Sequence, residues 1–287
     1  MLCRMRRSQT RYRKRKYKRT RKVRGGNPKK SFSFWNKYHY GDNILNLKFL
    51  YNISDILKAK GINIKYYYDD GYNKNKAELD RYIHPNGVVS LYSIKDKPAD
   101  AIELWMGDPI NNIESKELDK YYKLFYTKIL NILNLGNEKI DVSLYQPEPY
   151  LQDIYNKLDS KFKDLDILII NAAPKSAQFI YDEKAFNEMC IMLSKKYKVA
   201  TTSPVNDSIT CTMRDGLMLQ DIGAISTHAK YIIGIHSGPV TTCFNNTTTS
   251  SVKKWILFAD NHTTHEEINC IVISGKYDYN KIEKNMN

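Results

Sequence analysis

The stretch Asp166-Ile-Leu-Ile-Ile-Asn171 decides how this sequence is expected to fold. Its four central residues, 167–170, are all isoleucine or leucine and therefore leave no polar face. Such a run is typical of a strand that is buried on both faces, in a parallel sheet with helices on each side. Small and polar residues follow at once, in Ala172-Ala173-Pro174-Lys175-Ser176-Ala177-Gln178, and predict a loop at the carboxyl end of the strand.

Extended and helical patterns alternate on both sides of this strand. Downstream, the patterns predict helices over 182–196, 217–229 and 239–245, and strands over 197–202, 230–235, 254–259 and near 269–273. Upstream, they predict strands over 31–38, 62–68, 87–92 and 101–106, and helices over 43–60, 76–84, 115–134 and 150–163. This alternation favours an α/β fold built on parallel sheets.

Two prolines, Pro147 and Pro149, interrupt the alternation near its middle. Neither a helix nor a central strand continues through such a pair, so a domain boundary is predicted there, between 31–146 and 147–287. The halves are similar in size. They are expected to be two Rossmann-like, doubly wound domains facing a cleft, with ligands at the carboxyl ends of the strands.

The charge of the chain is concentrated at its start. The formal net charge is +14, yet residues 1–30 hold 15 Lys and Arg and no Asp or Glu, whereas residues 31–287 hold 30 basic and 31 acidic residues. Like charges and few apolar groups predict that residues 1–30 form a disordered basic tail. We expect at most a salt-sensitive contact with a polyanion or an anionic membrane through residues 4–30, or no partner at all.

Other classes of protein are disfavoured. The chain has no apolar run long enough to span a membrane and no apolar stretch behind its basic start, so we expect neither a transmembrane segment nor a signal peptide. Five cysteines without a C-x-x-C pair argue against a disulfide framework or a structural zinc site. A cytoplasmic location is therefore expected.

The first candidate site is the loop His39-Tyr40-Gly41-Asp42-Asn43, between the first strand and the first helix. Gly41 permits a tight turn or a close approach of the backbone to a ligand. Asp42 has two possible roles. It can cap the helix, or it can present a carboxylate that takes a proton from a hydroxyl group.

Two later loops suit a phosphate. Lys175 and Ser176 supply a cation and a hydroxyl group after the strand at 166–171, although a polar surface loop would look the same. In Gly234-Ile-His-Ser-Gly-Pro239 a strand runs into a small-residue turn, where His236 is either a ligand or a structural histidine. The small-faced helix start around Asp221 is a further candidate to flank a nucleotide.

These residues resemble glycosyltransferase family 9, the heptosyltransferase group. The similarity lies in the early Gly41-Asp42, the strand at 166–171 with its Lys-Ser loop, and the stretch from Leu217 through Gly238. Two departures stand out. His236 replaces the acid that precedes Ser-Gly in the family, and Thr241 and Thr242 occupy the region of a family histidine. The tail and the composition are also similar to proteins of giant DNA viruses, which would place the protein in the host cytoplasm or the virion.

The resemblance implies a GT-B fold and an inverting, metal-independent transfer of a sugar from a nucleoside-diphosphate sugar to a hydroxyl group. The donor would bind the C-terminal domain, the acceptor would bind the N-terminal domain, and Asp42 would be the catalytic base. Neither a cofactor nor a metal is expected. The implied donor-binding residues are Lys175, Ser176, Gln178, Asp221, His236, Ser237 and Gly238, and Gly41 and Asn43 belong to the loop on the acceptor side.

Other functions remain open. The His236 departure favours a non-catalytic nucleotide-binding protein of the same fold, and the basic tail favours a nucleic-acid-associated protein. A third possibility is another two-domain enzyme, such as a sugar-nucleotide epimerase. A dehydrogenase is disfavoured because the G-x-G-x-x-G fingerprint is missing.

Overall fold

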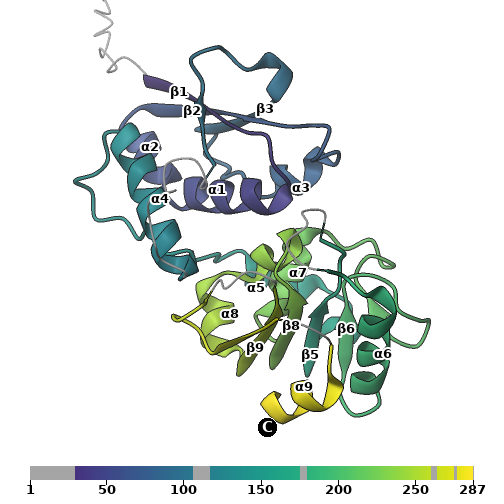
Figure 1. Cartoon of the computed structure of the whole chain (residues 1–287). Coiled ribbons are helices and arrows are strands. Elements are labelled where there is room, and N and C mark those ends of the chain that lie inside the picture. Colours follow the sequence, from purple (N-terminus) through teal and green to yellow (C-terminus); the bar gives the residue numbers. More distant parts are fainter. Residues whose placement is uncertain (1–29, 106–116, 175–179, 260–263, 275–276, 287) are drawn as a thin grey trace, which may run out of the picture.

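The chain folds around two parallel β-sheets (Figure 1). The computed structural model describes residues 30–105, 117–174, 180–259, 264–274 and 277–286. The basic tail up to residue 29 and the predicted ligands Lys175, Ser176 and Gln178 lie outside these ranges. Within them, no helix is long and apolar enough to cross a membrane.

The first sheet has the strand order β3-β2-β1-β4. Helices α1, α2 and α4 lie along one side of it (Figure 1). Phe49 of α1 stacks on Tyr126 of α4 with ring centroids 4.2 Å apart, and the Tyr126 hydroxyl donates to the Leu45 carbonyl. The elements of this half are β1 (Lys30–Asn36), α1 (Tyr40–Asn52), α2 (Ser54–Ala59), β2 (Ile62–Tyr68), α3 (Lys76–Asp80), β3 (Val89–Ser93), η1 (Ile94–Asp96), β4 (Ile102–Glu103) and α4 (Leu118–Ile132).

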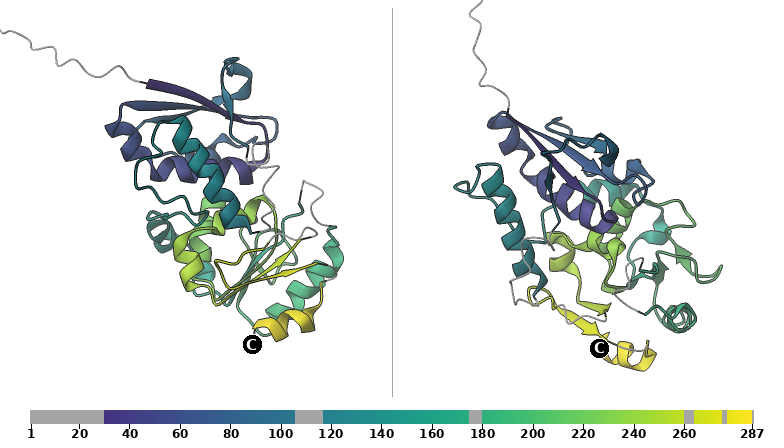
Figure 2. Two further views of the ribbon diagram at one scale, coloured as in Figure 1. Left: turned by 60° about the vertical axis from the view of Figure 1, so that its left-hand side comes forward. Right: turned by 45° about the horizontal axis from the view of Figure 1, so that its top comes forward.

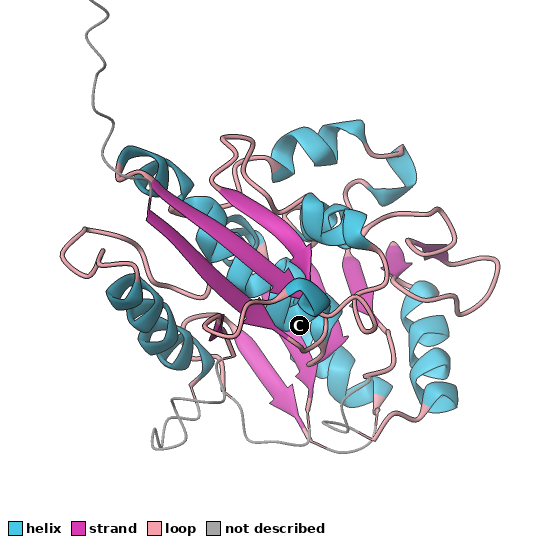
Figure 3. Cartoon of the chain, turned by 90° about the horizontal axis from the view of Figure 1, so that it is seen from above, coloured by secondary structure: helices cyan, strands magenta, loops and turns pink. Residues whose placement is uncertain are grey.

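The second sheet has the order β10-β9-β8-β5-β6-β7. Its strands and those of the first sheet are magenta in Figure 3, surrounded by cyan helices. Its elements are α5 (Leu151–Lys157), η2 (Ser160–Phe162), β5 (Ile167–Ile170), α6 (Glu183–Ser194), β6 (Val199–Thr201), β7 (Thr210–Cys211), α7 (Leu219–Ser226), β8 (Tyr231–Ile235), η3 (Gly238–Cys243), α8 (Asn246–Ser251), β9 (Lys254–Phe258), β10 (Cys270–Ile273) and α9 (Tyr279–Met286).

Strand β5 has the double burial that its sequence predicts. Ile167 and Ile169 join the core beneath α6 and α9, whereas Leu168 and Ile170 join the large core toward the first sheet. All four side chains are fully buried. Alternate residues of one strand thus supply two cores, and for this reason the strand contains no polar position.

The two halves share one continuous core. The large cluster contains Phe34 and Leu47 from the N-terminal half and Ile232 and Trp255 from the C-terminal half. Figure 2 shows the halves in contact in both of its views. The expected α/β fold of two Rossmann-like halves is confirmed, while the boundary between residues 146 and 147 stays a prediction.

Both sheets have a topological switch point. The chain leaves β1 toward β2 on one side and reaches β4 on the other, and it leaves β5 toward β6 before returning to β8 on the opposite side. Crevices form where the loops after neighbouring strands diverge in this way. The loops after β1, β5 and β8 are therefore the expected walls of a binding site.

Helix α1 differs from its prediction. It begins at Tyr40 rather than at residue 43, so Asp42 lies inside its first turn. The N-cap role, one of the two roles considered for Asp42, is therefore wrong. The N-cap position falls on His39, whose side chain makes no capping bond. The predicted single helix over 43–60 is broken at Ile53, where the Ser54 hydroxyl donates to the Leu50 carbonyl and so disturbs the helical ladder.

Other differences are local. The helix predicted over 239–245 is the tighter 3₁₀ turn η3, and the strand predicted over 101–106 is paired only at Ile102–Glu103. The elements β7, α8 and α9 were not expected from the sequence. Strand β7 and helix α8 are only 2 and 6 residues long, and α9 is a mostly polar helix of 8 residues.

Two glycines bring the halves into backbone contact. A Cβ atom on Gly41 would lie 2.8 Å from the Cα atom of Gly238, and one on Gly238 would lie 3.3 Å from the Gly41 nitrogen. The loop that carries Asp42 therefore touches the loop that carries Ser237, with no room for a side chain between them.

Gly41→Ala tests this contact. We expect the free energy of unfolding to fall by about 1–3 kcal/mol, the usual cost of overpacking. The new Cβ atom would meet the Gly238 Cα atom, which belongs to the backbone and cannot rotate away as a flexible side chain would. Urea denaturation measures this change. An unchanged midpoint would show that the two loops can separate without cost.

Candidate functional site

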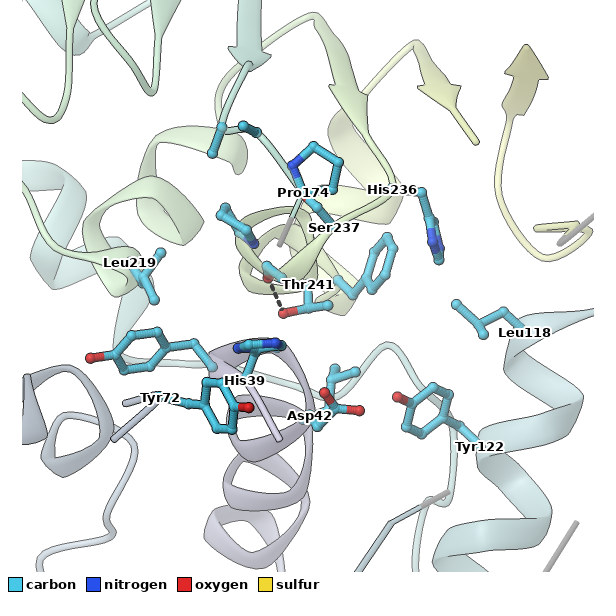
Figure 4. A pocket seen from close by; sticks show the side chains of 18 residues that line it. His39, Asp42, Tyr72, Leu118, Tyr122, Pro174, Leu219, His236, Ser237 and Thr241 are labelled. Carbon is cyan, nitrogen blue, oxygen red and sulfur yellow. Dashed lines mark hydrogen bonds between the residues drawn. The ribbon is translucent and has the colours of Figure 1, made fainter. Parts of the chain in front are cut away.

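A cavity of about 250 Å³ lies between the two sheets (Figure 4). Its walls come from the carboxyl ends of β1, β5 and β8, together with residues of α1, η3 and α4. Most lining side chains are apolar or aromatic, with a few polar groups among them, as is usual for small-molecule sites. The lining residues are His39, Tyr40, Gly41, Asp42, Leu45, Tyr72, Leu118, Tyr122, Ala172, Ala173, Pro174, Leu219, His236, Ser237, Gly238, Pro239, Thr241 and Phe244.

Asp42 is the acidic group of the described lining. Burial raises the pKa of its carboxyl group from 3.8 to about 6, against the opposing effect of a backbone hydrogen bond. In Figure 4 its carboxylate lies beside the Tyr122 ring of α4. At pH 7 the group is mostly ionised, and it is a stronger base than an exposed aspartate.

His236 and Ser237 form the opposite wall. The His236 amide donates to the Phe258 carbonyl at 2.9 Å and so fixes the turn after β8. Within the described residues, the buried His236 Nε2 and Ser237 Oγ atoms have no hydrogen-bond partner. Since unpaired buried polar atoms are costly, they indicate a place where a bound molecule supplies the partner.

His236 is neutral at physiological pH. Burial lowers its pKa to about 4, so the ring offers one N–H donor and one acceptor rather than a positive charge. Behind it lies His265, with ring centroids 5.3 Å apart, and the Tyr145 hydroxyl is 3.2 Å from His265 Nδ1. Burial, with a smaller contribution from His236, lowers the pKa of His265 to about 3.

The third wall is the loop after β5. Asn171 anchors its start, since the side-chain amide donates to the Ser203 carbonyl and its oxygen accepts from the Ser203 amide at 2.7 Å. Ala172, Ala173 and Pro174 then reach the cavity. The next residues of the loop include Lys175, Ser176 and Gln178, whose proposed contacts with a donor stay a prediction.

Asp221 lies away from the cavity. Its carboxylate binds Arg81, the residue after α3, in two places, at 2.6 and 2.9 Å, and accepts from the Met218 amide. Of the helix start that looked suited to a nucleotide, Leu219 lines the cavity, whereas the middle of the helix packs on protein, since a Cβ atom on Gly223 would lie 2.9 Å from the Thr242 carbonyl oxygen. The structure thus gives Asp221 a role in joining the halves.

Asn43 is also committed to the protein interior. It is fully buried, its amide donates to the carbonyls of Tyr38 and His39, and its oxygen accepts from the Tyr66 hydroxyl. It shapes the loop after β1 without lining the cavity. Of the predicted site residues, the structure brings Gly41, Asp42, His236, Ser237 and Gly238 together.

Sequence reasoning missed several lining residues. Tyr122 and Leu118 come from α4, and Tyr72 comes from the turn after β2, where its ring meets His39 edge to face at 4.7 Å. Nothing local marks these residues, because they reach the cavity only through tertiary packing.

No group of three His, Cys, Asp or Glu side chains suited to a metal ion occurs within the described ranges. The adjacent carboxylates of Asp69 and Asp70 belong to a turn. Asp69 accepts from the Gly71 amide at 2.8 Å, and Asp70 pairs with Lys95.

No family model and no curated protein sequence matches the chain. Solved structures with a similar course include E. coli heptosyltransferase WaaC with ADP, at 10% identity over 88% of this chain and 96% of that one, with a TM-score of 0.49. A family 9 glycosyl transferase from Veillonella parvula gives 13% identity over 90% and 91%, with a TM-score of 0.44. E. coli ADP-heptose LPS heptosyltransferase II gives 10% identity over 85% and 90%, with a TM-score of 0.46.

These proteins are heptosyltransferases and a family 9 glycosyltransferase, the group that the chain resembles in sequence. With identities near 10% and TM-scores below 0.5, this similarity carries no information about activity. The function proposed below therefore rests on the side chains of this chain.

The raised pKa of Asp42 predicts a specific dependence of stability on pH. The folded state holds the proton up to about pH 6 and the unfolded state releases it near pH 4, so ionisation of Asp42 lowers stability as the pH rises through this window. Asp42→Asn removes the effect. The stability of the variant relative to the wild type should rise by roughly 2–2.5 kcal/mol between pH 4 and pH 7.

Urea denaturation of both proteins across this range measures the difference, in which the contributions of all other titrating groups cancel. A constant difference would mean that Asp42 has an ordinary pKa and is open to water.

Proposed function

We propose that the protein is a glycosyltransferase that moves a sugar from a nucleoside-diphosphate sugar to a hydroxyl group. One observation carries the proposal. One cavity between two parallel sheets holds a buried carboxylate on one wall and, on the other, buried atoms of Ser237 and His236 that have no hydrogen-bond partner among the described residues. One wall can therefore accept a proton from one substrate, and the other wall can donate hydrogen bonds to the second substrate.

The C-terminal wall would bind the diphosphate. Negative charge builds up on the leaving diphosphate as the glycosidic bond breaks, and hydrogen-bond donors held in place stabilise that charge. The Ser237 hydroxyl and the neutral His236 ring are such donors, and Gly238 lies next to them in the lining. Lys175 and Ser176 are proposed to supply a cation and a further hydroxyl group, with Gln178 beside them.

The N-terminal wall would bind the acceptor. Asp42 would accept the proton of the attacking hydroxyl, which becomes acidic only as its oxygen bonds to the sugar. A pKa near 6 makes the carboxylate a better acceptor than a free aspartate while leaving it ionised at pH 7. Attack from the side opposite the diphosphate inverts the configuration at the sugar carbon.

We further propose that the transfer needs no metal ion. In this scheme the donors of Ser237 and His236, together with the Lys175 cation, take the place that an ion would have at the diphosphate. Activity retained in excess chelator supports this part, and loss of activity that Mg²⁺ or Mn²⁺ restores contradicts it.

A non-catalytic nucleotide-binding protein is the second candidate. The observation that favours it is the neutral His236, at the position where the family carries an acid. Binding of a nucleoside diphosphate without transfer from any nucleotide sugar would select it.

Asp42→Asn separates binding from chemistry. The amide keeps the shape of the side chain and cannot accept the proton. We expect the affinity for nucleoside diphosphate to stay within twofold of the wild type, while turnover falls by about 10²–10⁴. Calorimetry with ADP, GDP, UDP and CDP, and transfer assays with the matching sugar nucleotides, measure the two effects. Normal turnover in the variant would remove Asp42 as the base.

Ser237→Ala tests the opposite wall. Losing one hydrogen bond of about 0.5–1.5 kcal/mol should weaken nucleotide binding roughly 2- to 12-fold. Thr212→Ala is the matched control, since this buried hydroxyl bonds the Thr202 carbonyl away from the cavity. Equal affinity in the wild type and Ser237→Ala would place the diphosphate elsewhere.

A further inference from the structure

Lys48 is a buried cation that links the two halves. Its side chain is fully buried on α1, and its ammonium group donates to the carbonyls of Thr241, Thr242 and Phe244 at 3.1, 3.1 and 3.2 Å. These residues lie more than 190 positions further along the chain, on η3 and the residue after it. The fourth oxygen around the ammonium is Glu148 Oε1, at 2.5 Å.

A buried lysine is unfavourable unless its charge is compensated. Here the Glu148 carboxylate supplies the opposite charge, and three carbonyls take the hydrogen bonds of the ammonium. The Glu148 carboxylate is also buried, and it accepts from the Tyr150 hydroxyl at 2.7 Å. Burial raises the pKa of Glu148, and the adjacent ammonium opposes that rise. Apolar residues of similar volume would stabilise the core as well as the Lys48–Glu148 pair does. Core stability alone therefore does not explain the cluster, and we expect it to have another role.

The position of the cluster indicates that role. Lys48 lies six residues after Asp42 on the same helix, so one rigid element carries the carboxylate and the ammonium. The carbonyls that it holds end the same turn that begins at Ser237 and Gly238. At the other end of this turn, the Gly41 and Gly238 backbones touch. Helix α1 therefore holds the turn at both ends.

We propose that Lys48 is a positioning residue for the cavity, and this inference rests on the proposed function. By holding the carbonyl end of η3 against α1, Lys48 fixes Ser237 Oγ and His236 Nε2 at a set separation from Asp42 before any ligand binds. The diphosphate wall is thereby preorganised, and the binding free energy is not spent on ordering it.

The test uses a double variant that regains much of the stability of the protein without regaining the contact between Lys48 and the carbonyls. Lys48→Met alone leaves the Glu148 charge buried and unpaired, which is destabilising. In Lys48→Met/Glu148→Gln no charge is left unpaired, so much of the lost stability returns, whereas the three carbonyls still lack their donor. We expect the double variant to exchange the amide hydrogens of residues 238 and 240–244 at least tenfold faster than the wild type. Its affinity for the nucleoside diphosphate bound best among ADP, GDP, UDP and CDP should fall about tenfold.

Two further variants complete the design. Lys123→Met removes a lysine paired with the buried carboxylate of Asp119 on α4, away from η3, and should change neither readout. If the double variant does not fold, Lys48→Met/Glu148→Leu/Tyr150→Phe replaces the whole cluster with apolar groups and is expected to fold. Wild-type exchange at 238 and 240–244 and wild-type affinity in either folded variant would overturn the inference.

Failure of the proposed function gives a different result. If the wild type binds none of the four nucleotides, the proposed function fails and the ligand part of this inference fails with it. The exchange rates still decide whether Lys48 holds the turn, because that measurement needs no ligand.

Discussion

The contact of the Lys48 ammonium with three carbonyls of η3 and the residue after it is the interaction on which the cavity depends. It joins the helix after β1 to the turn after β8, and these are the elements that carry Asp42 and Ser237. The Gly41–Gly238 backbone contact and the Arg81–Asp221 ion pair join the halves at other points. A continuous apolar core runs between these contacts, so the cavity has walls of fixed spacing.

Burial of the titratable groups in and behind the cavity walls accounts for the electrostatics of the site. The same desolvation raises the pKa of the acid Asp42 and lowers the pKa values of the bases His236 and His265. Near neutral pH, Asp42 is therefore the charged group among these three. A site of this kind has one proton acceptor and several neutral donors, which suits a reaction that removes a proton on one side and builds negative charge on the other.

Local patterns predicted the elements better than the contacts between them. The double burial of 167–170 and the turns at Gly41 and Gly238 follow from composition and spacing, and they placed five of the predicted site residues at one cavity. Asp221 and Lys48 show the limit. Arg81 lies 140 positions from Asp221, and the carbonyls that Lys48 binds lie 193 to 196 positions away from it, so no local pattern reveals these contacts. One local feature does mark Lys48: it lies on the same face of the helix as the apolar residues Ile44, Leu47 and Tyr51.

The most direct measurement is a crystal structure of the protein with the nucleoside diphosphate that it binds best. We expect the diphosphate to lie against Ser237 and His236, with its terminal phosphate directed toward Asp42 and the α1–η3 contacts unchanged. A diphosphate bound outside the cavity between the ends of β1, β5 and β8, or one that reaches Ser237 only after η3 has moved away from Lys48, would contradict this expectation.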